Sequence, residues 1–84
     1  MSEPKNGSAL AGPLMRITAL RRASEMLGPV EMSEALGIQP RSLRAKLGAD
    51  RGVSDADLTI AATALAAHAE RVAAMALKLR ELAA

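Results

Sequence analysis

Basic side chains near the middle of the chain are the residues best suited to binding chemistry. Residues 39–52 carry four cations and one anion, or +3, whereas the 84-residue chain carries +2, so the remainder carries −1. Guanidinium groups bind phosphate oxygens and the major-groove edge of guanine in bidentate fashion. Such runs also occur on solvated helix faces, but this concentration of charge favours a surface that meets nucleic acid. The charged residues of the stretch are Arg41, Arg44, Lys46, Asp50 and Arg51.

The sequence offers no residues suited to metal binding or catalysis. The chain has no cysteine, and its single histidine, His68, has no acid three or four residues away, so we expect no metal site. No Ser-His-Asp set, phosphate-binding loop or paired buried carboxylates can be identified, so we expect no catalytic residue, no cofactor and no enzyme. The absence of Phe, Tyr and Trp excludes stacking platforms for single-stranded nucleic acid and RNP-type RNA binding. Of the nucleic acids, double-stranded DNA remains as a candidate partner.

Composition predicts one small, all-α domain in the cytoplasm. Half of the residues are hydrophobic, and Ala, Leu, Met, Arg and Glu, which favour helices, dominate the sequence. A chain of this size buries a small core, so pairing with another chain would stabilise it. The lack of cysteine fits a reducing compartment. We identify no signal pattern in residues 1–13 and no apolar run of the roughly 18 residues that span a bilayer, so we expect no membrane contact.

Three short helices are expected before residue 54. Residues 1–11 show no periodicity and are predicted to form a flexible tail. The first helix is predicted to begin near Gly12-Pro13 and to end at Gly28-Pro29, where glycine suits a left-handed cap. Its inward stripe is predicted to be Leu14, Ile17, Leu20, Ala23 and Leu27.

A tight turn is predicted between the second and third helices. The second helix covers about 30–36, and the third begins near Pro40 and ends at Gly48, with Leu43 and Leu47 facing inward. Gly37 between them supplies the positive φ that a sharp turn needs. Ser33 would lie where the two helices cross and only a small side chain fits. The inward residues of the second helix are predicted to be Val30, Met32, Ser33 and Leu36.

The segment 29–48 resembles the helix-turn-helix of the phage-repressor-like (XRE-type) regulators. The resemblance is carried by Leu36-Gly37-Ile38 and by Leu43, and it extends over about residues 14–60. The sequence departs from the family pattern at Ser33, where alanine is usual, and at Lys46, where a second apolar residue is usual. The resemblance implies that a recognition helix of about residues 40–47 enters the major groove. The DNA-contacting residues would be Gln39, Arg41, Ser42, Arg44, Ala45, Lys46 and Arg51.

A long final helix is predicted from Ser54 to about residue 82, roughly 42 Å at 1.5 Å per residue. Ser54 is a good N-cap, and Asp57 stands at the N3 position of a capping box. From Leu58 onward, apolar or small residues recur at the a and d positions of four heptads, with His68 as the one exception. We expect the first half to pack on the chain's own helices and the second half to dimerise, in an orientation that the sequence leaves open. The dimerisation residues would be Leu65, His68, Ala69, Val72, Met75, Ala76, Leu79 and Leu82.

Together these features predict a small homodimeric, sequence-specific DNA-binding regulator, with repression as the simplest activity. Its parts would be the tail at 1–11, a helix-turn-helix domain at 12–53 and a dimerisation helix at 54–84. An alternative is a helical interaction module, antitoxin-like or an adaptor, whose heptad helix binds a different protein. The basic third helix distinguishes the two hypotheses, because an interaction module does not need it.

Overall fold

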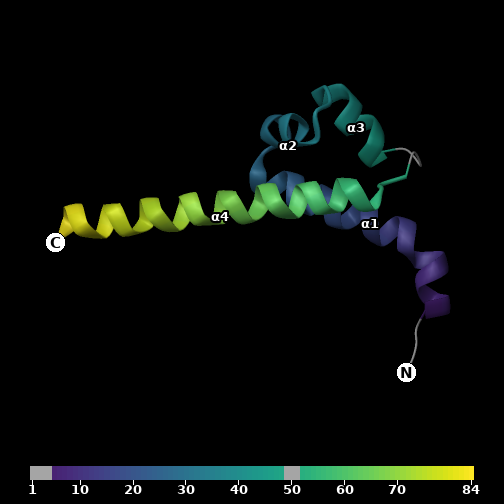
Figure 1. Ribbon diagram of the computed structural model, residues 1–84, viewed down its shortest axis with the longest axis horizontal. Coiled ribbons are helices and arrows are strands. Elements are labelled where there is room, and N and C mark those ends of the chain that lie inside the picture. Colours follow the sequence, from purple (N-terminus) through teal and green to yellow (C-terminus); the bar gives the residue numbers. More distant parts are fainter. Residues whose placement is uncertain (1–4, 49–51) are drawn as a thin grey trace.

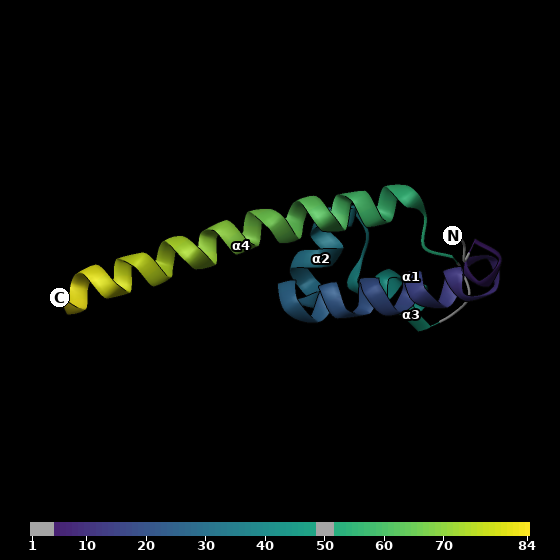
Figure 2. The ribbon, with the colours of Figure 1, turned by 90° about the horizontal axis from the view of Figure 1, so that it is seen from below.

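The protein is all-α, as predicted. The computed structural model describes residues 5–48 and 52–84, which form four helices and, within these ranges, no strand (Figure 1). They are α1 (Lys5–Leu27), α2 (Pro29–Leu36), α3 (Pro40–Gly48) and α4 (Asp55–Ala83). The predicted boundaries of α2, α3 and α4 are confirmed to within a residue or two. The short helices α2 and α3 lie over one side of α4, and α1 runs alongside α4 (Figures 1 and 2).

The prediction for the start of the first helix was wrong. Helix α1 begins at Lys5, so residues 5–11, which we expected to form an irregular tail, are helical, and α1 has 23 residues. Pro13 consequently lies inside the helix rather than at its first position. An internal proline removes one i→i−4 hydrogen bond and bends a helix. The N-terminal turns of α1 indeed depart from the axis of the remainder (Figure 1).

A small core joins all four helices. Met32 of α2 is fully enclosed, and Leu20 and Leu43 are each only 1% exposed. Ser24 is a buried polar residue on the core face of α1, and its hydroxyl donates to the Leu20 carbonyl at 2.8 Å. The buried apolar residues are Leu20, Leu27, Met32, Leu43, Val53 and Ala61.

Two residues that we expected to face inward are exposed instead. Leu14 is 69% exposed and Val30 is 59% exposed. Each residue advances about 100° around a helix, so two steps of three residues turn Leu14 about 120° away from Leu20. Val30 similarly lies about 160° from Met32 around α2, because it is only two residues before it. The remaining inward residues of both helices are buried or packed against the core, as predicted.

Helix α4 is capped as the sequence predicts. The Ser54 hydroxyl accepts from the Asp57 backbone N–H at 3.0 Å, and the Asp57 carboxylate accepts from the Ser54 N–H at 3.0 Å. These reciprocal bonds satisfy two backbone donors at the start of the helix. They fix residue 54 as the point where the connection ends and α4 begins.

The two halves of α4 lie in different surroundings. Ala61 is buried, and Leu58 and Leu65 pack against the core, so the prediction that the first half packs on the chain's own helices is confirmed. Residues 72–83, called here the C-terminal half of α4, extend beyond the other helices (Figures 1 and 2). Their large apolar side chains are more than half exposed, namely Val72, Met75, Leu77, Leu79 and Leu82.

In the described part of the chain, α4 is the one helix long and apolar enough to cross a membrane by length and composition. The sequence has no uninterrupted apolar run of 18 residues, because polar and charged side chains interrupt α4. Any 18-residue stretch of α4 contains both Glu70 and Arg71. Arg71 forms a 2.7 Å ion pair with Glu31 of α2, so this part of α4 is bound to the rest of the protein.

Candidate nucleic-acid interface

The turn between α2 and α3 has a complete helix-ending motif. Gly37 adopts the left-handed conformation with φ 71° and ψ 31°, which confirms the predicted positive φ. Its N–H donates to the Glu34 carbonyl at 3.1 Å, and the Ile38 N–H donates to the Ser33 carbonyl at 2.9 Å. This pair of bonds is the Schellman arrangement, which ends a helix and redirects the chain. The turn therefore sets the angle at which α3 leaves α2.

Ser33 occupies the enclosed position that the sequence analysis assigned to a small residue. It is 1% exposed, and its hydroxyl donates to the Val30 carbonyl at 2.7 Å. The bond satisfies the hydroxyl inside the core, where an unpaired polar group is costly. Leu43 is buried from the α3 side. Helices α2 and α3 are thus joined by a packed contact as well as by the turn.

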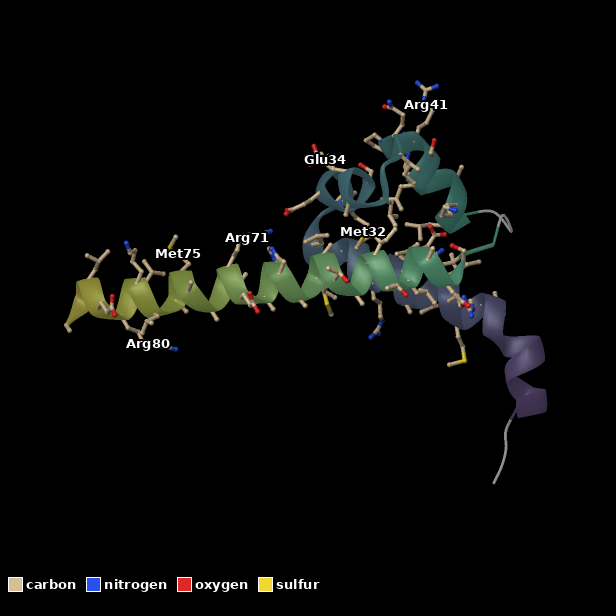
Figure 3. All side chains as sticks on the ribbon, in the orientation of Figure 1. Met32, Glu34, Arg41, Arg71, Met75 and Arg80 are labelled. Atoms are coloured by element: carbon tan, nitrogen blue, oxygen red, sulfur yellow. The ribbon has the colours of Figure 1, made fainter. Side chains whose placement is uncertain are left out.

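One face of α3 is open to solvent. Arg41 projects from α3 away from α4 and the rest of the molecule (Figure 3). Arg44 is also exposed, and neither arginine forms a salt bridge with any residue in the ranges 5–48 and 52–84. A hollow of about 380 Å³ lies beside this face and is lined by Ile38, Ser42, Ala45 and Lys46. The exposed candidate residues are Gln39, Arg41, Ser42, Arg44 and Ala45.

Lys46 is less available than the other candidate residues. Its ammonium lies 3.1 Å from the Asp57 carboxylate at the start of α4, and its side chain is only 25% exposed. We expected Lys46 to contact DNA, and its ion pair could not be foreseen because Asp57 lies in a different helix. Lys46 therefore ties α3 to α4 in this structure. The remaining candidate, Arg51, lies outside the described residues.

The carboxyl of Asp57, which pairs with Lys46, has a shifted pKa. Partial burial raises the pKa of the carboxyl, but the hydrogen bond from the Ser54 backbone N–H and the Lys46 ammonium lower it by more. The pKa of Asp57 consequently lies below its ordinary value of 3.8. A carboxyl whose pKa is lowered in the folded state stabilises that state above the unfolded pKa. This stabilisation is lost as the pH falls through the lowered folded-state pKa.

We expect the Asp57→Asn variant to lose that acid-sensitive component of stability. The variant should be destabilised by less than about 1 kcal/mol at pH 7, because the ion pair is partly exposed. The difference from the native sequence should shrink as the pH falls below about 4, the ordinary pKa of the unfolded carboxyl, and through the still lower pKa of folded Asp57. Urea unfolding at pH 7, 4 and 2.5 measures the difference, with Glu81→Gln on exposed α4 as a control. A difference that stays constant with pH would show that the carboxylate charge contributes nothing.

Two arginines of α1 bind residues on either side of the connection between α3 and α4. Arg16 donates to the Val53 carbonyl at 3.2 Å and pairs with Asp55 at 2.6 Å. Arg21 donates at 2.9 Å to the carbonyl of Leu47, in the last turn of α3. Carbonyls in the last turn of a helix lack helical partners, and a cation there also suits the helix dipole. These two anchors were not predicted, because their only signal in the sequence is their position beside the apolar stripe of α1.

The predicted dimerisation residues form a separate region from the α3 face. Leu65 and His68 are half-buried near the body of the protein, and Ala76 is half-buried farther along α4. The others are exposed, namely Ala69, Val72, Met75, Leu79 and Leu82. The structure thus presents two surfaces, a polar and basic one on α3 and an apolar one on α4.

Comparisons with known proteins assign no relative to the chain. No protein-family model, curated protein or solved structure matches it. Within residues 5–48 and 52–84, no cluster of three or more His, Asp or Glu side chains is placed to hold a metal ion. Function must therefore be inferred from the two surfaces themselves.

Proposed function

We propose that this protein is a small homodimeric DNA-binding regulator that inserts α3 into the major groove. The observation that carries the proposal is the exposed arginine face of α3, which a packed turn holds at a fixed angle. A packed helix that turns a basic, exposed face to solvent has the shape and charge that the major groove accepts. The resemblance of segment 29–48 to XRE-type regulators supports the same reading.

Each exposed residue of α3 has a role in this proposal. Arg41 and Arg44 are about one turn apart and reach guanine edges or phosphates. Gln39 and Ser42 lie near the start of α3, the end that enters the groove in helix-turn-helix proteins. Ala45 leaves room for close approach and for contact with a thymine methyl group. Lys46 adds a phosphate contact only if its ion pair with Asp57 opens.

Dimerisation completes the proposed mechanism. Two copies related by a two-fold axis place two recognition helices in successive major grooves, about 34 Å apart, on a palindromic site. The chain then represses transcription by occupying DNA that polymerase needs. The exposed C-terminal half of α4 supplies the apolar surface through which the copies pair.

One observation also favours the alternative of an interaction module. The C-terminal half of α4 is long, apolar and exposed, and a helix of another protein would pack on it equally well. In that case DNA affinity is absent, or it appears only with the partner. A direct binding measurement on the isolated protein separates the two functions.

The test is fluorescence anisotropy of a labelled DNA duplex titrated with the full chain over a salt series. We expect binding at low salt that weakens linearly in log affinity against log salt, because each phosphate contact releases counterions. A slope of about −4 or steeper would indicate several phosphate contacts in the dimer. The absence of binding at low salt, by protein whose helical content is verified by circular dichroism, would overturn the proposal and leave the interaction module.

A further inference from the structure

We propose that two copies of this chain pair antiparallel through one particular stripe of α4, so that each copy's C-terminal half lies along the other's N-terminal half. The inference deepens the dimer of the proposed function and rests on it, but it does not depend on DNA affinity. It is carried by a pattern of residue sizes, by where these residues are exposed, and by the positions of charges on α4.

Large and small residues alternate along this stripe without exception. Successive members are four and three residues apart, the spacing that keeps one edge of a helix against a partner helix over a long distance. The pattern covers four heptads, which is enough for a stable helix pair. The members of this Leu/Ala stripe are Leu58, Ala62, Leu65, Ala69, Val72, Ala76, Leu79 and Ala83.

The exposed members of the Leu/Ala stripe differ in size between the two halves of α4. In the first half, Leu58 and Leu65 pack against the core, while Ala62 and Ala69 are exposed. In the C-terminal half, Val72 and Leu79 are 54% and 59% exposed. The first half of α4 therefore exposes small residues that leave room for a partner's side chains. The C-terminal half exposes large apolar side chains that no other residue covers.

A hollow marks the receiving half of the Leu/Ala stripe. About 200 Å³ of open space lies between α1 and the first half of α4. Figure 2 shows these two helices running side by side, with the C-terminal half of α4 continuing past them. The lining is apolar and consists largely of alanine and leucine, namely Ala19, Leu20, Ala23, Leu58, Ala61, Ala62 and Leu65. A leucine or valine of a second copy fills such a hollow without displacing a charged group.

Antiparallel pairing matches these two halves. When the two α4 helices cross near Glu70 and Arg71, Leu79 of one copy lies over Ala62 of the other, and Val72 lies over Ala69. Every layer of the pair then contains one large and one small residue, which fills the space evenly. Parallel pairing would stack Leu79 on Leu79 and Ala62 on Ala62, which alternates crowding with voids.

The positions of charges on α4 support this stripe rather than the a and d positions of the heptad. Arg71 and Lys78 both flank the a and d positions on the same edge, and antiparallel pairing there would bring cations of the two copies together. Both residues lie more than a quarter turn from the Leu/Ala stripe at about 100° per residue. Arg80 lies only about 40° around the helix from Ala76 and so flanks the Leu/Ala stripe, but the position opposite it in the other copy is the uncharged Ala61.

The arrangement also places both α3 helices for the proposed function. The Lys46–Asp57 ion pair holds α3 level with Asp57, about 20 Å along α4 from the crossing point at 1.5 Å per residue. The two α3 helices are then about 40 Å apart along α4, close to the roughly 34 Å between successive major grooves. Arg71 and Met75 point toward the side of α4 on which α2 and α3 lie (Figure 3). That side is roughly perpendicular to the Leu/Ala stripe, so both α3 helices face the same way.

A layer-swap experiment tests the packing. The dimer dissociation constant, measured by sedimentation equilibrium, should rise roughly a hundredfold in Leu79→Ala, because each dimer loses two buried leucines. Ala62→Leu should weaken the dimer by crowding the same layer. The double variant Ala62→Leu/Leu79→Ala exchanges large for small and should bring the constant back to within about tenfold of the native value. Leu77→Ala, an equally exposed leucine outside the stripe, should leave it unchanged.

Cysteine cross-linking tests the direction of pairing, since the native chain has no cysteine. Under mild oxidation, Ala62→Cys/Leu79→Cys should form a covalent dimer in high yield, whereas Leu79→Cys alone should not. Efficient cross-linking of Leu79→Cys alone would overturn the antiparallel arrangement while leaving a dimer. A native protein that stays monomeric at all concentrations would overturn the inference, as would a double variant that dimerises as weakly as Leu79→Ala. If that monomer still binds DNA, the proposed recognition surface on α3 does not depend on the dimer.

Discussion

Replacing Arg41 and Arg44 together by alanine is expected to weaken binding of duplex DNA by the dimer roughly a thousandfold or more, because the dimer loses four arginines that each contribute about 1–3 kcal/mol at a groove or phosphate. Both side chains are exposed on α3, and Arg41 projects away from the body. Their loss should leave the fold intact. Fluorescence anisotropy at several salt concentrations measures both the affinity and its salt dependence.

The salt dependence shows what the two arginines contact. If both meet phosphate, the slope of log affinity against log salt should flatten by about two for each copy bound. If they read guanine edges, affinity for the preferred site should fall more than affinity for random duplex. The matched control is Arg22→Ala/Lys78→Ala, which removes the same charge from exposed positions on α1 and α4. An equal loss in both double variants would mean that only net charge matters and that α3 has no special role.

Met32→Ala is expected to destabilise the protein by about 2–5 kcal/mol. Met32 has no exposed surface and lies in the core that joins all four helices, so its loss leaves a cavity. A domain of this size has only a few kcal/mol of net stability, so the variant should be largely unfolded near body temperature. Thermal and urea unfolding followed by circular dichroism at 222 nm measures the change.

Met26 provides a matched control for this prediction. It is also a methionine in a helix, but it is 64% exposed. Met26→Ala should change the free energy of unfolding by less than about 0.5 kcal/mol. Similar losses in the two variants would mean that burial at the α2 position does not hold the helices together.

Features fixed by neighbouring residues could be predicted from the sequence. The capping box of Ser54 and Asp57 and the left-handed turn at Gly37 depend on bonds that span three to five residues. The exposed side of α3 also followed from the inward spacing of Leu43 and Leu47. These features need no knowledge of the tertiary arrangement, because the physical constraint acts within one or two turns of the chain.

Features that depend on another helix could not be predicted in this way. Lys46 looked like a free cation until α4 placed Asp57 beside it, eleven residues along the chain. The anchoring roles of Arg16 and Arg21 could not be predicted, because their partners are 26 to 39 residues away along the chain. The start of α1 was missed for a different reason, because Pro13 resembled a first helical residue and was instead an internal bend. The use of the α3 face remains a prediction.

The continuity of α4 has a consequence for how the protein melts. Twelve residues separated from the body would form little helix in water, because starting a helix costs far more than extending one. In this protein the packed first half already provides the first turns, so residues 72–83 need only extend them. Amide exchange should therefore quicken steadily toward Ala83 rather than change abruptly at Val72. A partner that binds the C-terminal half of α4 slows this fraying. Because that half continues the same hydrogen-bonded helix as the packed first half, the binding also raises the stability of the whole domain.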